Sequence, residues 1–299
     1  MKKLAELLTP VVPGLFLLPA ANGGRFPQSH CFVVRDEVEA LIDAGAGLDR
    51  LQEVARRWRP DRVIASHSHP DHCGGLWIFA GVRLTSPIQH ADLFWRLDAM
   101  GDRLVAPGDL AAMWKRFVTA NMGIRDVAAD DHFDDLDVFD FGRVKLTALR
   151  APGHLEDHYL FFEPHHGLAL TFDIDLTGFG PWYGHPEADV DRFIADIRRL
   201  IDLRPRLLVT SHKGLIDAEI QERLRAYLDI FFQRDRLVRE LLAAPRTLAE
   251  LVDASPFYRG HPYMPPVMRF WEGVMIDKHL RRLARDGRAI CEGERWRRI

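Results

Sequence analysis

Three histidines and one aspartate lie within six positions of the segment Ser66-His67-Ser68-His69-Pro70-Asp71-His72-Cys73-Gly74-Gly75. The segment directly follows the apolar run Val63-Ile64-Ala65, which predicts a buried strand, so these polar side chains are expected on the loop where the strand ends. Neutral imidazole and carboxylate are the ligands that zinc and similar divalent ions take in proteins. So many ionisable groups in one place repel each other and lose hydration on burial, a cost that a bound cation would offset. The segment therefore predicts a metal site.

A further ligand-type residue follows each of three later apolar runs that predict strands: His154, Asp173 and His212. The ends of strands in stacked sheets can meet at one edge of the fold, where a binding site is expected. We therefore expect these three side chains to join the histidine segment in a single site.

The elements that must position these residues alternate between strands and helices. Apolar patterns predict strands at 14–18, 31–34, 39–42, 63–65, 82–84, 144–149, 159–162, 168–172 and 206–210, and helices at 48–58 and 189–203. A mixed order of this kind predicts a layered α+β fold.

Residues from about 91 to 127 interrupt this alternation with mostly helical sequence rich in bulky apolar side chains. These are Phe94, Trp95, Met100, Leu104, Met113, Trp114 and Phe117. One interpretation is an amphipathic insertion packed on the core, and the other is a lid that forms one wall of the site.

The remainder of the chain, residues 216–299, is expected to form a smaller, mainly helical domain. Its patterns predict a long helix at 219–242, a short helix capped by Thr247 with Glu250 three residues later, a helix at 270–284 and a terminal hairpin at 288–296. Residues 281–299 contain seven arginines and three acidic residues, a net charge of +4. This end could contact phosphate groups, or it could be a solvated surface paired with acids of the same chain.

The composition of the 299-residue chain, 47% hydrophobic and 28% charged, is that of a globular protein with an ample core. A net charge of -3 gives no overall attraction to nucleic acid or to an anionic membrane, and no apolar run is long enough to span a bilayer. The Leu-rich N-terminus resembles a signal peptide, but Glu6, Pro10 and Pro13 interrupt it. Three widely spaced cysteines argue against a disulfide framework and favour a cytoplasmic location.

These motifs, taken together and in this order, closely resemble the metallo-β-lactamase superfamily of hydrolases. The matching pieces are 67–72, Pro152-Gly153-His154, Asp173 and Ser211-His212, and Leu41-Ile42-Asp43-Ala44-Gly45 resembles the family's strand-ending Asp motif. The resemblance implies a four-layer αββα sandwich over residues 1–215, with helices on both outer faces of two sheets and metals at one edge. Residues 216–299 resemble the winged-helix-like C-terminal domain of one subgroup.

The same resemblance implies two metal sites, with Zn²⁺ expected in both and iron or manganese as alternatives. It assigns His67, His69 and His154 to the first ion, Asp71, His72 and His212 to the second, and Asp173 as the bridge between them.

Two features near these ligands leave alternatives open. The family usually has Gly before the bridging Asp, whereas this chain has Phe172, and Asp175 is a competing carboxylate. His158, four residues after His154, is interpreted as a packed or supporting histidine.

The function implied is a binuclear metal-dependent hydrolase that uses a metal-bridging hydroxide on a small ester, thioester or lactone, with Asp71 orienting that hydroxide or relaying its proton. Candidate substrate contacts are Tyr183, Lys213 and His261, and Trp182, His185 and Tyr263 are further candidates for the pocket wall. The expected partner is thus a small molecule, and the sequence says nothing of the oligomeric state.

Three other functions compete with this one. A metal-dependent nuclease of the same fold would need a long basic groove. A mononuclear iron dioxygenase shares the first ligand set, but the second set is intact here. A DNA-binding regulator would use the C-terminal domain on DNA and the metal site as a sensor.

Overall fold

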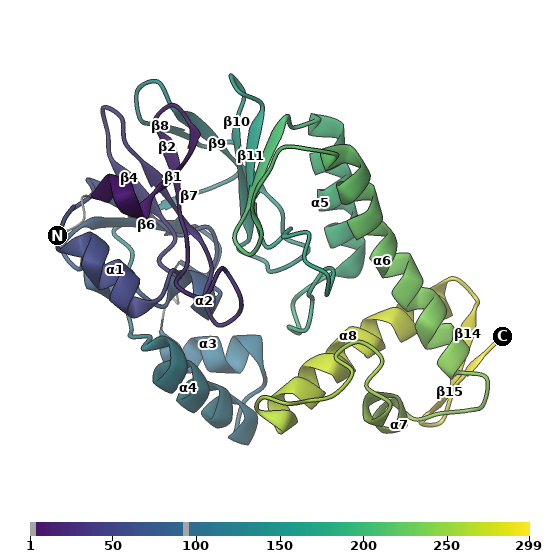
Figure 1. The fold of residues 1–299 in the computed structure, drawn as a ribbon. Helices are drawn as coiled ribbons and strands as arrows, with labels where there is room; N and C mark the ends of the chain where they lie inside the picture. Colours follow the sequence, from purple (N-terminus) through teal and green to yellow (C-terminus); the bar gives the residue numbers. More distant parts are fainter. Residues whose placement is uncertain (1–3, 92–95) are drawn as a thin grey trace.

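The computed structural model describes residues 4–91 and 96–299, which form two stacked β-sheets flanked by helices (Figure 1). A short 3-10 helix, η1 (Leu4–Leu7), leads into the first sheet. That sheet has seven strands in chain order: β1 (Thr9–Val12), β2 (Leu15–Leu18), β3 (Cys31–Val34), β4 (Ala40–Ile42), β5 (Arg62–Ile64), β6 (Arg83–Pro87) and β7 (Asp131–Phe133). The second sheet has the order β13 (Gly214–Ile216), β12 (Leu207–Thr210), β11 (Leu168–Phe172), β10 (Tyr159–Glu163), β9 (Lys145–Arg150) and β8 (Val138–Asp140).

The alternation of side chains along β3 explains the layering. Phe32 and Val34 pack into the apolar core between the two sheets, whereas Cys31 and Val33 pack on the outer face of the first sheet. Helix α1 (Leu48–Ala55) covers that outer face, and α5 (Val190–Leu203) covers the outer face of the second sheet. Every residue of β3 is buried, as its unbroken apolar sequence requires of a strand covered on both sides. The layered arrangement of strands and helices that the sequence predicted is confirmed.

The helical prediction for the segment after residue 91 is confirmed by α3 (Leu97–Leu104) and α4 (Asp109–Met122). Met100, Leu104 and Trp114 of these helices are buried in the same apolar cluster as the outer face of the first sheet. Phe94 and Trp95, which the sequence placed among the apolar residues of this segment, lie outside the described residues.

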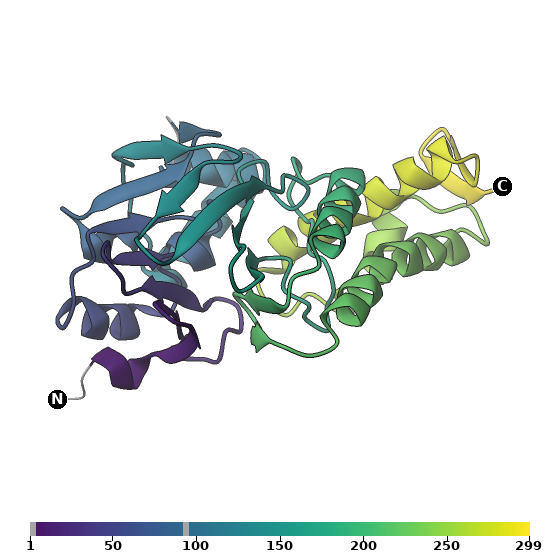
Figure 2. The same ribbon diagram turned by 90° about the horizontal axis from the view of Figure 1, so that it is seen from above.

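The C-terminal part contains α6 (Ile220–Leu241), α7 (Leu248–Asp253), α8 (Pro265–Arg285) and the hairpin β14 (Ala289–Glu292)–β15 (Arg295–Arg298). The predicted capping box begins α7: the Thr247 hydroxyl accepts from the Glu250 backbone N–H at 3.2 Å, and the Glu250 carboxylate accepts from the Thr247 backbone N–H at 2.7 Å. Helix α6 packs on α5, and α8 packs on both α6 and α4. The order of helices and hairpin agrees with the prediction, whereas a winged-helix arrangement stays a prediction. Figure 2 shows these helices on the side of the molecule opposite the N-terminus.

The arginines of the C-terminal end are mostly paired with acids of the same chain. The ion pairs join Arg281 to Asp277, Arg282 and Arg285 to Asp191, Arg295 to Glu250 and Arg297 to Glu292. This pairing favours the solvated-surface interpretation over a phosphate-binding face. Among the described helices, none has the length and apolar character needed to cross a membrane.

Candidate metal centre

The histidine segment leaves the end of β5 and turns directly into α2 (Pro70–Cys73), a single helical turn that sequence patterns missed because it is so short. His67 and His69 lie on the loop before this turn, and Asp71 and His72 lie within it. Pro70 occupies the first helical position, where its fixed φ suits the turn and its missing N–H costs nothing. A 3-10 helix, η2 (Leu76–Phe79), follows at once.

The backbone of α2 is held by the strand-ending motif after β4. The Ala44 N–H donates to the His72 carbonyl at 2.7 Å, and the Ser29 hydroxyl donates to the Asp71 carbonyl at 2.8 Å. Between them, a Cβ on Gly45 would lie 1.6 Å from the Asp71 carbonyl oxygen, so no side chain fits there. The two chain segments can approach this closely only because position 45 is glycine.

A Gly45→Ala substitution is therefore expected to destabilise the fold by about 1–3 kcal/mol, because the added methyl group must push Asp71 and its neighbours away from β4. Urea denaturation and the metal content of the purified variant measure the two effects. Gly178→Ala is the matched control, since a Cβ there meets nothing within 4 Å. Equal stability of the two variants would contradict the tight packing at Gly45.

Asp43 connects this motif to the ligand histidines. Its carboxylate is fully buried and accepts from the Ser66 N–H at 2.7 Å, from the Ser66 hydroxyl at 2.8 Å and from His72 Nδ1 at 2.8 Å. A carboxylate that holds one nitrogen of a histidine orients the other nitrogen toward a metal. The sequence showed Asp43 only as part of a family motif and did not indicate this contact.

The five predicted ligand histidines surround the carboxylate of Asp173. The distances to its Oδ2 are 3.6 Å from His67 Nε2, 3.2 Å from His69 Nδ1 and 3.1 Å from His154 Nε2, and those to its Oδ1 are 2.9 Å from His72 Nε2 and 3.5 Å from His212 Nε2. Two groups of ligand atoms each lie within 4.8 Å of one another: those of His67, His69, His154 and Asp173, and those of Asp71, His72 and His212. All seven residues predicted as ligands are thus brought together.

Outer hydrogen bonds determine which ring nitrogen faces the centre. The Nδ1 atoms bond to the Ser66 hydroxyl for His67 (2.9 Å), the Trp182 carbonyl for His154 (2.9 Å) and the Gly24 carbonyl for His212 (2.7 Å). With His72 held in the same way by Asp43, four histidines direct Nε2 toward Asp173.

His69 has the opposite orientation, and His185 determines it. His185 Nδ1 lies 2.6 Å from the Leu104 carbonyl oxygen, which can only accept, so His185 Nδ1 carries the proton and its Nε2 is the acceptor. His69 Nε2, 2.7 Å from His185 Nε2, must then donate, which leaves the lone pair of His69 on Nδ1, facing Asp173. Burial, together with the neighbouring His69 ring, holds the pKa of His185 well below its ordinary value and keeps the ring a neutral acceptor.

These donor atoms fit a divalent cation. His69 Nδ1 and His154 Nε2 lie 3.1 Å apart and both face Asp173, an arrangement of lone pairs that a cation would stabilise. His67 Nε2, His72 Nε2 and Asp173 Oδ1 are buried. Although His72 Nε2 lies 2.9 Å from Asp173 Oδ1, none of the three atoms makes a hydrogen bond of good geometry among the residues the structure describes. Burial and the charge of His72 hold the pKa of His67 well below its ordinary value, so that ring is neutral, as a ligand must be.

The two carboxylates that competed for the bridging role are clearly separated. Burial alone would raise the pKa of Asp173, but the charge of His72 and the surrounding histidines hold that pKa well below its ordinary value. Asp175 instead accepts from the Tyr227 hydroxyl at 2.9 Å. The geometry therefore favours Asp173.

Phe172 occupies the position before Asp173 where glycine is usual, and its φ of 46° is in the left-handed region. Its ring is fully buried and makes edge contacts with Phe32 and Phe161, at centroid distances of 5.5 and 5.3 Å. This packing compensates for the unfavourable backbone that turns Asp173 into the site.

Two further side chains support the histidine segment. Arg103 of α3 donates to the Ser68 hydroxyl at 2.8 Å and pairs with Asp157 at 3.2 Å, which ties the helical insertion to the site. His158 is fully buried with its ring centroid 5.0 Å from that of His67, and its Nδ1 lies 3.1 Å from the Ala151 carbonyl oxygen. This position agrees with the interpretation of His158 as a packed histidine.

A cavity of about 470 Å³ opens beside the candidate metal ligands, with His69, Asp71, Asp173 and His212 in its lining. Among the candidates for substrate contact or pocket wall, Lys213, Trp182, His185 and Tyr263 also line it.

Tyr183 and His261 are not among the residues that line this cavity, and their role as substrate contacts stays a prediction. The Tyr183 hydroxyl lies 2.6 Å from His279 Nε2 and the side chain is fully buried. His261 Nε2 lies 2.5 Å from a carboxylate oxygen of Glu272. Both side chains point toward residues of α8 instead of toward the candidate metal ligands. Their positions in the sequence do not reveal this direction.

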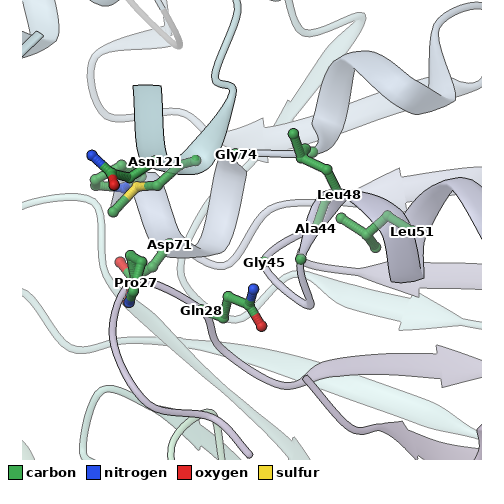
Figure 3. Close-up of a pocket in the computed structure, with 13 residues that line it drawn as sticks. Pro27, Gln28, Ala44, Gly45, Leu48, Leu51, Asp71, Gly74 and Asn121 are labelled. Carbon is green, nitrogen blue, oxygen red and sulfur yellow. The ribbon is translucent and has the colours of Figure 1, made fainter. Parts of the chain in front are cut away.

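A second cavity, of only about 40 Å³, borders Asp71. Figure 3 shows it, with Asp71 and Pro27 at one side and Leu48 and Leu51 at the other. It has room for water but not for a substrate.

Comparison with known proteins agrees with this geometry. The model of the metallo-beta-lactamase superfamily matches residues 24–212, and the chain belongs to that family. With its cluster of histidines and carboxylates at one edge of the sandwich, the protein is a metal-dependent hydrolase with a divalent-metal site.

Individual proteins of known name share about a quarter of their residues with this chain, or fewer. The chain is 25% identical to acyl-coenzyme A thioesterase MBLAC2 of Gallus gallus, over 72% of this chain and 83% of the relative. It is 24% identical to an atrochrysone carboxyl ACP thioesterase of Pseudocercospora fijiensis, over 94% of this chain and 78% of the relative. The fold is similar to that of a metallo-beta-lactamase family protein from Thermus thermophilus, with a TM-score of 0.74, 21% identity and coverage of 97% of this chain and 100% of the other.

Proposed function

We propose that the protein is a binuclear zinc hydrolase that cleaves small thioesters, with esters and lactones as the nearest chemical alternatives. The observation that carries this proposal is the pair of ligand groups around Asp173, of which His69, Asp71, Asp173 and His212 line a substrate-sized cavity. Two of the proteins named above, those of Gallus gallus and Pseudocercospora fijiensis, are thioesterases by name, which supports the choice of thioester among the acyl substrates.

His67, His69 and His154 would hold one ion, Asp71, His72 and His212 the other, and Asp173 would bridge them. When bound, divalent ions at these positions lower the pKa of water and stabilise the negative charge that develops on the carbonyl oxygen. The outer hydrogen bonds from Asp43, Ser66 and His185 keep the ring nitrogens in place before the ions arrive.

In the reaction, water adds to the thioester carbonyl carbon and the bond from carbon to sulfur breaks. One proton of the water must leave before or during the attack. The departing sulfur takes up one proton, so the products are a carboxylic acid and a thiol. Asp71 is the side chain we assign to this proton, because it lines the cavity and its Oδ2 lies 3.5 Å from His212 Nε2.

We further propose that residues 1–215 form the catalytic domain, with the helical insertion at about 91–127, and that residues 216–299 form a second, winged-helix-like domain. The support is the order of three helices followed by a hairpin after the last strand of the second sheet.

The test is elemental analysis of the purified protein together with a panel of thioester, ester, lactone, phosphodiester and RNA substrates. We expect zinc in the protein and release of thiol from thioesters, lost on chelation and restored by Zn²⁺. Cleavage of phosphodiester or RNA without thioester cleavage would replace this proposal with the nuclease.

Lys213 gives a separate prediction about the substrate. It is exposed on the cavity lining beside His212 and, within residues 4–91 and 96–299, forms no ion pair. Lys213→Ala is expected to raise KM about fivefold for a thioester whose thiol part carries phosphate, which corresponds to ~1 kcal/mol, with a smaller effect at high salt. KM for a neutral N-acetylcysteamine thioester should stay the same.

Lys145→Ala is the control, because Lys145 pairs with Asp140 and is outside the cavity lining. Equal increases for both substrates would contradict a charge contact.

A further inference from the structure

Most of the wall of the large cavity is apolar, although the candidate metal ligands in its lining are polar. The wall is built from side chains of three separate parts of the chain: Trp114 and Phe117 of α4, Phe179 and Trp182 of the loop after β11, and Met268 and Trp271 of α8. Figure 1 shows α4 and α8 meeting beside the sandwich. Side chains of both helices line the cavity. A volume of about 470 Å³ lies in the range of sites that enclose a small organic ligand.

Two of the three indole N–H groups of this wall, those of Trp182 and Trp271, donate to groups of the protein itself. Trp182 Nε1 donates to the Tyr258 hydroxyl at 2.6 Å, and Trp271 Nε1 donates to the Leu104 carbonyl at 3.1 Å. The indole rings therefore offer the cavity carbon surface. A polar ligand would lose its hydration against such a wall without gaining hydrogen bonds from the two indoles.

The apolar surface continues out to the solvent. Phe26 and Tyr263 line the same cavity and are 53% and 66% exposed. The Phe26 ring is stacked on Phe117, with a centroid distance of 6.2 Å and an interplanar angle of 2°. Exposed rings continuous with an apolar cavity mark a binding surface more often than isolated exposed rings do.

Two methionines suit a wall that must accept a flexible chain. Met264 and Met268 are partly buried in the lining, and methionine side chains adapt to irregular apolar shapes. The polar groups of the lining include the metal-ligand residues His69, Asp71, Asp173 and His212. An acyl compound can therefore place its carbonyl group at the metal ligands and its hydrocarbon part against the wall.

From this division of the cavity we infer that the site is specific for acyl groups with a long, apolar hydrocarbon chain, bound between α4, α8 and the loop after β11. The inference rests on the proposed hydrolase function for the reaction, but the binding of the hydrocarbon chain can be measured without it.

The first experiment compares thioesters from acetyl to dodecanoyl on the same thiol. The value of kcat/KM is expected to rise about three- to fourfold per added methylene until the cavity is full, as burial of one methylene predicts. The second experiment measures binding of dodecanoate and of acetate to the zinc-loaded protein by calorimetry, with tryptophan fluorescence as a second signal because three tryptophans line the cavity.

Met268→Glu places a charge in the wall and should weaken dodecanoate binding at least tenfold, with the same decrease in the ratio of dodecanoyl to acetyl kcat/KM. Met113→Glu is the matched control, because Met113 is a partly buried methionine of α4 outside the cavity lining. Zinc content and melting temperature show that both variants are folded.

The outcomes separate the two proposals. Dodecanoate binding that Met268→Glu weakens and Met113→Glu does not supports the inference, even if no thioester is cleaved. Cleavage that is independent of chain length, with no dodecanoate binding, overturns the inference and leaves the proposed hydrolase in place.

Discussion

Asp173→Asn is expected to lose at least one of the two metal ions and to reduce kcat/KM by roughly three orders of magnitude, about 4 kcal/mol of transition-state stabilisation. Asparagine has nearly the same shape but no negative charge, and Asp173 lies within 3.6 Å of a ring nitrogen from each of five histidines. Without the carboxylate, cations placed among these rings would have no common anionic ligand. Metal content by elemental analysis and thiol release from a thioester are the measurements.

Asp175→Asn is the matched control for this variant. Asp175 is two residues away and also partly buried, but its carboxylate accepts from the Tyr227 hydroxyl and, in the described part of the chain, forms no ion pair or hydrogen bond with a ligand histidine, although the charge of His212 acts on it from farther away. It should keep the full metal content. Metal loss in Asp175→Asn with retention in Asp173→Asn would reverse the assignment of the bridging carboxylate.

His185→Phe is expected to weaken metal binding by about 10- to 100-fold, the usual cost of removing a group that orients a ligand histidine. His185 Nε2 holds the proton-bearing Nε2 of His69, and without this acceptor the His69 ring can flip or change tautomer. Competition with a chelator of known affinity measures the change, and the melting temperature of the metal-free protein separates it from a loss of stability.

His185→Gln provides the graded test of the same contact. The glutamine carbonyl oxygen can accept from His69 Nε2, so this variant should recover part of the metal affinity that His185→Phe loses. Unchanged metal affinity in His185→Phe would show that His69 needs no partner at Nε2.

The sequence alone was sufficient to predict that the candidate ligand residues gather in one site and that the fold is layered. His67, His69, Asp71 and His72 are close in sequence, so any loop at the end of β5 brings them near one another, and local spacing carries that information. The strands were recognisable because residues such as Phe32 and Val33 pack on opposite faces and both are buried, which requires an unbroken apolar run.

Only the tertiary structure decided the contacts that tune the centre. Asp173 and Asp175 differ by two positions and have the same side chain, and the left-handed turn at Phe172 separates their roles. His185 acts on His69 across 116 positions of sequence, and its tautomer depends on a carbonyl of α3. No local pattern encodes such long-range pairs.

The residues that line the substrate cavity are the clearest case of contacts that the sequence alone did not predict. Trp114 of α4 and Trp271 of α8 line the same cavity although their positions in the sequence are far apart, and each alone has the pattern of an ordinary helix packed on a core. Tyr183 and Trp182 are adjacent in sequence, yet Trp182 lines the cavity while Tyr183 turns toward His279. Sequence spacing identifies the candidate ligands of the histidine segment because those residues are neighbours in the chain. The direction of each side chain around the substrate depends on how helices from distant segments pack together.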